Sequence, residues 1–161
     1  MQLAFQFQLL ELLRHDVPLQ KRVATAEIIE FQYRLFPAKV TLVGVTERYD
    51  NYWQRVPLLG FASIIFAAYL KLRSSTAYSY ELPEANDELF FARRGDTVEF
   101  RTDMCATVTT FPFLDFARAA TSFSEAALME VVKTYPEIRK NREVTDWYPD
   151  RNSLIKLNFG T

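Results

Sequence analysis

The sequence predicts an α+β domain in which an antiparallel meander sheet of about six to seven strands carries two helices on one face. Short segments alternate apolar and polar residues, the two-residue period of a half-buried strand. Two longer segments repeat apolar residues at steps of three and four, the period of a helix. The strands come in runs without βαβ alternation, which favours antiparallel pairing. At 161 residues the chain is predicted to form a single domain, with a core over about 1–140 and a C-terminal arm over about 141–161.

The first third of the chain is predicted to contribute three strands. LAFQFQL (3–9) alternates apolar and polar residues and predicts the first of them. AEIIEFQYRLF (26–36) and KVTLVGVTE (39–47) are rich in β-branched and aromatic residues, which favour strands. Pro37 and Ala38 separate these two segments, so they are predicted to pair as a hairpin.

The segment VPLLGFASIIFAAYLKL (56–72) predicts a buried helix rather than a membrane span. Only 15 uncharged residues separate Arg55 from Lys71, whereas a helix needs about 20 to cross a bilayer. A helix that is apolar nearly all round is buried on most sides. Asp50 or Asn51 is the expected cap, and Pro57 is tolerated in the first turn.

The second half is predicted to add strands over 77–82, 88–102 and 105–110, the middle pair turning at Arg94 and Gly95. A long apolar stripe then predicts a second helix from about 113 to 135, bounded by Pro112 and Pro136. One continuous helix is preferred, but a capping box near residue 122 leaves a break open. The segment SLIKLNF (153–159) forms either a last strand or an irregular arm.

No catalytic residue, metal site or cofactor is predicted. The phosphate loop, the dinucleotide fingerprint, the HExxH zinc motif and the GxSxG elbow are all missing from the sequence. His15 lies beside Asp16 but lacks a nucleophile, so a surface loop is the expected setting. Because the chain has one Cys and one His, it can build neither a disulfide framework nor a Cys/His zinc site. Cys105 is expected to be a small buried apolar residue.

Charge argues against nucleic acid as a partner, because the formal net charge is −1. Residues 1–80 hold nine basic and six acidic side chains, and residues 81–161 hold ten and fourteen. The segment ELPEANDE contains no basic residue and is either a solvated loop or a contact for a basic protein partner. Its acidic residues are Glu81, Glu84, Asp87 and Glu88.

Two aromatic residues near the C-terminus are candidate interface anchors. Trp147 and Tyr148 lie between acids in DWYPD, and large amphipathic aromatic side chains are typical anchors at interfaces. The alternative is that Trp147 folds back onto the core. The N-terminus has no basic segment before its apolar residues, so no secretory signal is predicted and a cytoplasmic location is expected.

The order of these segments resembles the small immunity proteins of bacterial polymorphic and contact-dependent growth inhibition toxin systems. The resemblance covers roughly residues 1–140 and is carried by YWQRVPLLGFASIIFAAYL, by the arginine-glycine hairpin and by TVTTFPFLDFARAATSFSEAALMEVVKTYPEI. It implies a non-enzymatic cytoplasmic protein that binds and neutralises the C-terminal domain of a cognate toxin, often a nuclease, as a monomer in a 1:1 complex. The alternative is a small-ligand-binding or enzymatic α+β domain, with some of the 24 aromatic residues lining a pocket between sheet and helices.

Overall fold

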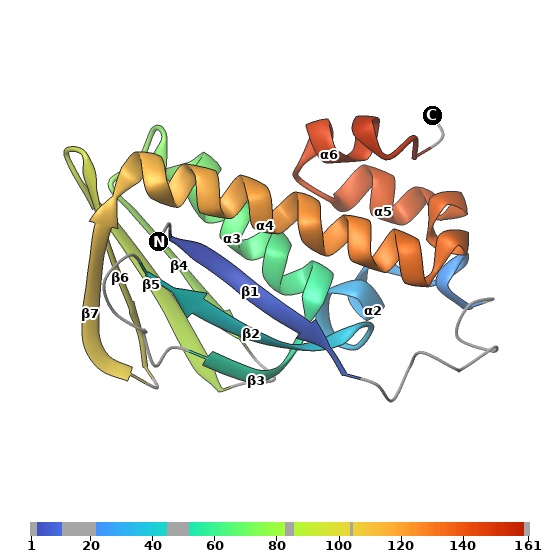
Figure 1. Ribbon diagram of the computed structural model, residues 1–161, viewed down its shortest axis with the longest axis horizontal. Coiled ribbons are helices and arrows are strands. Elements are labelled where there is room, and N and C mark those ends of the chain that lie inside the picture. The colour runs from blue at the N-terminus through green and yellow to red at the C-terminus, as the bar shows by residue number, and fades with distance from the viewer. Residues whose placement is uncertain (1–2, 11–21, 45–51, 83–85, 104, 160–161) are drawn as a thin grey trace.

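The computed structural model describes residues 3–10, 22–44, 52–82, 86–103 and 105–159. It confirms the α+β class and corrects the sheet. The strands of the described segments form two antiparallel sheets, one ordered β1-β2-β3 and the other β4-β5-β6-β7, in place of one continuous meander (Figure 1). Two long helices are present as predicted, and short helices accompany them.

The three-stranded sheet consists of β1 (Ala4–Leu9), β2 (Pro37–Val43) and β3 (Tyr52–Pro57). The prediction of β1 is confirmed. Strand β3 was not predicted, because a cap at Asp50 or Asn51 assigns residues 52–57 to the start of the following helix. Pro57, in an extended conformation, occupies the N-cap position of that helix, so the expected cap at Asp50 or Asn51 was wrong. Those two residues lie outside the described part of the chain.

The predicted hairpin over 26–47 is wrong, because its first half forms the short helix α2 (Ile28–Tyr33). The backbone N–H of Glu27 donates to the Glu30 carboxylate at 3.3 Å, which satisfies one donor at the start of the helix. Phe31 is fully buried and its ring lies 6.0 Å from that of Phe36. Tertiary packing has overridden the strand propensity of the β-branched and aromatic residues.

The four-stranded sheet follows the prediction closely. It consists of β4 (Ala77–Leu82), β5 (Asp87–Arg94), β6 (Thr97–Thr102) and β7 (Cys105–Pro112), paired in chain order. Gly95 has a φ of 61° in the turn between β5 and β6, a conformation that glycine adopts without steric cost. The Arg-Gly-Asp tripeptide therefore serves as a hairpin turn.

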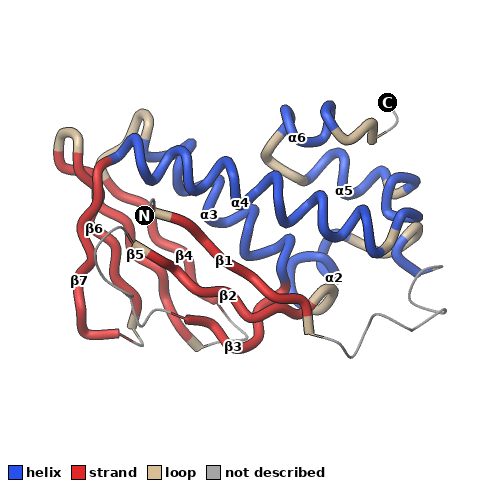
Figure 2. The backbone as a smooth tube through the Cα atoms, viewed as in Figure 1, coloured by secondary structure: helices blue, strands red, loops and turns tan. Residues whose placement is uncertain are grey.

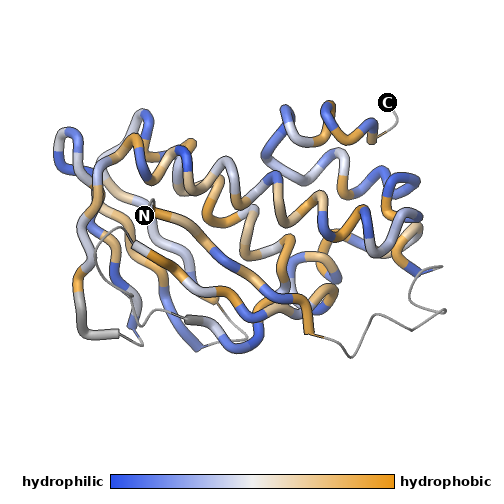
Figure 3. The backbone as a smooth tube through the Cα atoms, in the orientation of Figure 1, coloured by the Kyte–Doolittle hydropathy of each residue, from blue (hydrophilic) through white to orange (hydrophobic). Residues whose placement is uncertain are grey.

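The two long helices are α3 (Leu58–Leu72) and α4 (Phe113–Thr134). Helix α4 is continuous, which was the preferred prediction. Apolar and polar residues are interspersed along it (Figure 3). The two helices pack against each other, α4 also lies along β1, and α3 lies along β4 (Figure 1). No helix in the described segments is long and apolar enough to cross a bilayer.

The C-terminal arm is helical, so both interpretations of SLIKLNF, strand or irregular arm, were wrong. The 3₁₀ helix η2 (Pro136–Lys140) follows α4, and the arm contains α5 (Arg142–Trp147) and α6 (Arg151–Lys156). All three are grouped at one end of α4 (Figure 2). Asn141 is buried and caps α5 while its amide donates to the carbonyls of Val23 and Ala26 at 2.8 and 2.9 Å. This side-chain amide therefore joins the C-terminal arm to the segment that precedes α2.

Aromatic rings link both sheets to both long helices. Neighbouring ring centroids in the series lie 4.7–6.3 Å apart, the range of favourable aromatic pairs. The series runs through Phe5, Phe123, Phe61, Trp53, Phe100, Phe91 and Phe116. These aromatic residues therefore build the core.

Candidate functional site

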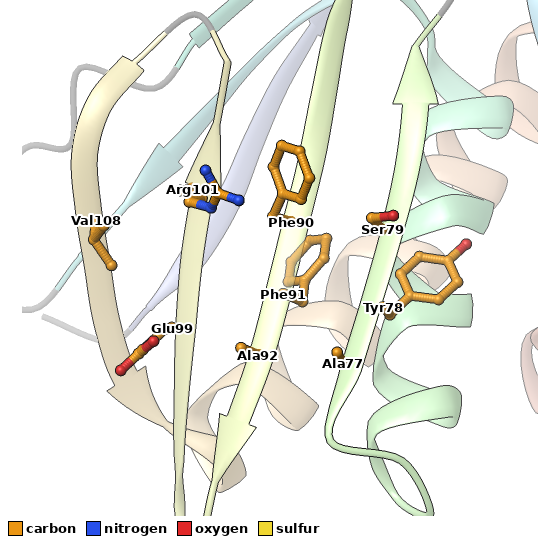
Figure 4. Close-up of a pocket in the computed structure, with 9 residues that line it drawn as sticks. All are labelled: Ala77, Tyr78, Ser79, Phe90, Phe91, Ala92, Glu99, Arg101 and Val108. Carbon is orange, nitrogen blue, oxygen red and sulfur yellow. The ribbon is translucent and has the colours of Figure 1, made fainter.

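The outward-facing side of the four-stranded sheet is the candidate site. In β5 the side chains of Leu89 and Phe91 are buried on the side of the helices, and Phe90 between them faces outward. Figure 4 views the sheet from this outward side, with the other sheet and the helices behind it. We call it the outer sheet face and define it by Ala77, Ser79, Glu81, Glu88, Phe90, Ala92, Glu99, Arg101, Val108 and Thr110.

A hollow of about 590 Å³ lies on the outer sheet face. Part of its lining consists of small side chains, because Ala77 on β4 pairs directly with Ala92 on β5. Larger side chains border these alanines: Phe90 lies between Ser79 and Arg101 in one row across three strands (Figure 4). The hollow thus results from an alternation of small and large residues on one face.

Arg101 and Phe90 form a cation–π pair in this hollow. The guanidinium carbon of Arg101 lies 4.0 Å from the centre of the Phe90 ring. Arg101 is exposed and Phe90 is half-buried, so both remain accessible to a partner. Aromatic residues and arginine dominate binding energy at protein interfaces, and a stacked arginine loses little further freedom on binding.

The acidic groups of the outer sheet face differ in their pairing. Glu99 is bonded to Arg94 at 3.1 Å. Glu81 and Glu88 lie directly opposite each other on β4 and β5, and within the described segments neither has an ion-pair or hydrogen-bond partner for its carboxylate. Like charges in this position destabilise a sheet. A cationic group placed beside both carboxylates would relieve this repulsion.

The acidic segment predicted as a contact surface is divided by the structure. Glu81 and Glu88 reach the outer sheet face, and Glu84 lies outside the described residues. Asp87 points inward, is only 2% exposed and accepts a hydrogen bond from the Trp53 indole at 3.2 Å. Its carboxylate links β5 to β3, so an exposed binding role for Asp87 was wrong.

Tyr148 was also misplaced as an accessible anchor. Its side chain is fully buried, and its hydroxyl donates to the Ser124 carbonyl at 2.8 Å and accepts from the Ser124 hydroxyl at 3.0 Å. Burial raises the pKa of Tyr148 far above its ordinary value. Trp147 is half-buried and packs against the core, which fits the alternative that it folds back.

A separate crevice of about 130 Å³ lies between β4, α3 and the C-terminal arm. Tyr78, Tyr80 and Trp147 contribute its aromatic lining, and Gly60 and Ser63 of α3 contribute small residues. Burial, together with a hydrogen bond to Tyr33, raises the pKa of Tyr80 to about 12. This crevice occupies the place between sheet and helices where an aromatic pocket was considered.

Phe90 and Arg101 were missed as site residues. The signal was present, since two-residue alternation in β5 and β6 puts Phe90, Glu99 and Arg101 on one face. The site was instead predicted from the acidic residues of the neighbouring segment ELPEANDE.

In the described part of the chain, no cluster of three or more His, Cys, Asp or Glu side chains could hold a metal ion. Comparisons with protein-family models, curated proteins and solved structures give no match.

Proposed function

We propose that this chain is a non-enzymatic immunity protein, which binds and neutralises a cognate bacterial toxin domain through the outer sheet face. The observation that carries the binding surface is the accessible Arg101–Phe90 pair beside a hollow of about 590 Å³. The identity of the partner as a toxin rests on the resemblance of segment order over residues 1–140. The complex is proposed to be 1:1, cytoplasmic and independent of cofactors.

The shape of the outer sheet face supports a protein partner. The residues that line the hollow all lie on strands β4 to β7 (Figure 4). A small molecule is usually enclosed over most of its surface, whereas a protein interface needs a broad area with a few anchors. Phe90 and Arg101 provide such anchors.

The charge of the outer sheet face supports a basic partner. Glu81 and Glu88 repel each other in the unbound chain, and a lysine or arginine placed between them would remove that repulsion. Nuclease toxins hold phosphate groups and so present basic clefts. Opposite charges also accelerate encounter between two proteins.

The proposal is tested by co-expressing the tagged chain with the C-terminal domain of the toxin encoded beside its gene. We expect a 1:1 complex on purification and rescue of growth. Phe90→Ser is expected to abolish capture, and Ile155→Ser, which changes an apolar residue 73% exposed on α6, should leave capture intact. Failure of the unmodified chain to capture the domain or rescue growth would refute the proposal.

A second candidate function, binding of a small ligand, is favoured by the crevice at Tyr78, Tyr80 and Trp147. Its volume of about 130 Å³ is below the roughly 300–1,000 Å³ of ordinary ligand sites. A thermal-shift screen against a metabolite library separates the two functions, because a ligand that stabilises the chain and loses its effect in Trp147→Leu would favour this one.

A further inference from the structure

Strand β7 is an edge of its sheet and lacks most of the usual protection, apart from an irregular register with β6. Its eight residues, CATVTTFP, include no charged side chain, and the only proline is the last residue. Val108 in its middle is 53% exposed. Natural sheets guard their edges with lysine, proline, bulges or a covering element, because an open row of N–H and C=O groups pairs with other strands.

The other edge strands contact helices. Strand β1 lies along α4, β4 lies along α3, and β3 contacts α2 and α3. The main contacts of β7, within the described segments, are with β6 and with α4, the helix that follows it directly at Phe113. Figure 1 shows β7 at the edge of the molecule, with no described element beyond it. The pairing with β6 is irregular between Cys105 and Thr109, the stretch that contains Val108, whereas from Thr109 to Pro112 the strand pairs regularly.

We propose that the partner protein adds an extended segment to β7, so that it continues the sheet as a fifth strand. This inference rests on the proposed function and states how the toxin domain docks. Strand addition draws its affinity from main-chain hydrogen bonds and its specificity from alternate side chains. Because β7 is uncharged and Val108 is exposed, the added segment should place an apolar residue beside Val108.

Position and charge favour a basic partner over a second copy of this chain. Strands are spaced about 4.8 Å apart, so Glu81 on β4 lies roughly 14 Å from β7 across the sheet. A domain that pairs with β7 can therefore cover the Arg101–Phe90 pair and place basic groups on Glu81 and Glu88. Pairing of two copies through β7 would leave these carboxylates at the far ends of the joint sheet, still unpaired.

The test is hydrogen exchange of the full chain, alone and with the C-terminal domain of the adjacent toxin. We expect hydrogen exchange at the β7 amides to slow by about tenfold or more in the complex, because these amides form new hydrogen bonds to the added strand. Val108→Lys should weaken binding by about tenfold or more through the cost of a charge in the new strand pair. The matched control is Leu114→Lys, which alters an apolar side chain 67% exposed on α4 and should bind normally.

The outcomes distinguish this inference from the proposed function. Binding with unchanged β7 exchange, or with normal affinity in Val108→Lys, would overturn strand addition and leave the immunity function standing. Absence of any binding by the unmodified chain would overturn both. A dimer of the isolated chain in light scattering that Val108→Lys dissociates would assign the edge to a second copy and overturn the docking of a partner.

Discussion

Glu81 and Glu88 face each other across β4 and β5, and this arrangement opposes folding. We predict that Glu81→Lys, which replaces repulsion with attraction, raises the free energy of unfolding by about 0.2–1 kcal/mol. The same change should weaken partner binding, a trade between stability and function that is common at binding sites. Urea unfolding measures the first effect. Unchanged or lower stability would show that the two carboxylates do not repel each other.

Two glycines are predicted to resist substitution for different reasons. A Cβ at Gly60 would lie 2.4 Å from the backbone oxygen of Gln32. Gly60→Ala must therefore move α2 away from α3, which should lower the free energy of unfolding by about 1–3 kcal/mol. Gly95 has open space around it but a φ of +61°, so Gly95→Ala should cost about 1 kcal/mol.

The matched controls for these glycines are Gly95→Asn and Asp96→Ala. Asparagine accepts the left-handed conformation, and the Asp96 side chain is exposed, so both should be close to neutral in thermal unfolding. Equal losses in Gly95→Ala and Asp96→Ala would contradict the turn assignment.

The Tyr80 hydroxyl should make the free energy of unfolding decrease at high pH. Burial first, and then its hydrogen bond with Tyr33, raise its pKa to about 12 from an ordinary 10.0. Between these values the unfolded chain has lost the proton while the folded chain retains it, so stability decreases as pH rises from about 10 to 12. Tyr80→Phe should reduce this slope in urea titrations at pH 9 and 11.5. An identical slope in the variant would contradict the assignment.

At the scale of elements, helix α3 provides the most direct test of the core. Ile65 in its middle is fully buried. Ile65→Asp would bury a carboxylate at a cost of several kcal/mol, out of a typical total of about 5–15 kcal/mol. We therefore expect the variant to unfold or to melt far lower in circular dichroism. Leu70→Asp on the same helix, where the side chain is exposed, is the control, and equal melting of the two would contradict the packing.

The elements predicted well were those whose pattern and boundaries agreed. Strand β5 turns into β6 at a glycine, and α4 runs between two prolines, so periodicity and punctuation gave the same answer. Helix α2 was not predicted, because Ile28, Ile29 and Phe31 favour a strand by local propensity. Packing against distant segments makes this stretch helical instead. Asn141 and Asp150, both buried caps, were overlooked as the starts of α5 and α6.

At the scale of the whole molecule, the split into two sheets could not be read from local pattern. It depends on contacts between segments far apart in sequence, such as the Trp53 indole bonded to Asp87. Acidic composition pointed to Glu81 and Glu88, which lie on the outer sheet face, and equally to Asp87, which is buried, because charge in a sequence does not reveal burial. For the same reason the Arg101–Phe90 pair was found only in the structure.

The central claim is that the outer sheet face binds a basic toxin domain, and association kinetics measured by surface plasmon resonance test it most directly. The test variant is Glu81→Lys/Glu88→Lys on the outer sheet face. The control is Glu143→Lys/Asp146→Lys on α5, two exposed residues whose reversal changes net charge equally. Both variants are compared with the unmodified chain against the C-terminal domain of the proposed cognate toxin at low and high salt.

The account predicts that the association rate of the unmodified chain falls as salt rises, because screening weakens attraction between opposite charges. At low salt the association rate of the outer-face variant should fall by about tenfold or more. The association rate of the α5 control should stay within about twofold of that of the unmodified chain. An association rate in the outer-face variant equal to that of the control would contradict the claim and remove this surface from the interface.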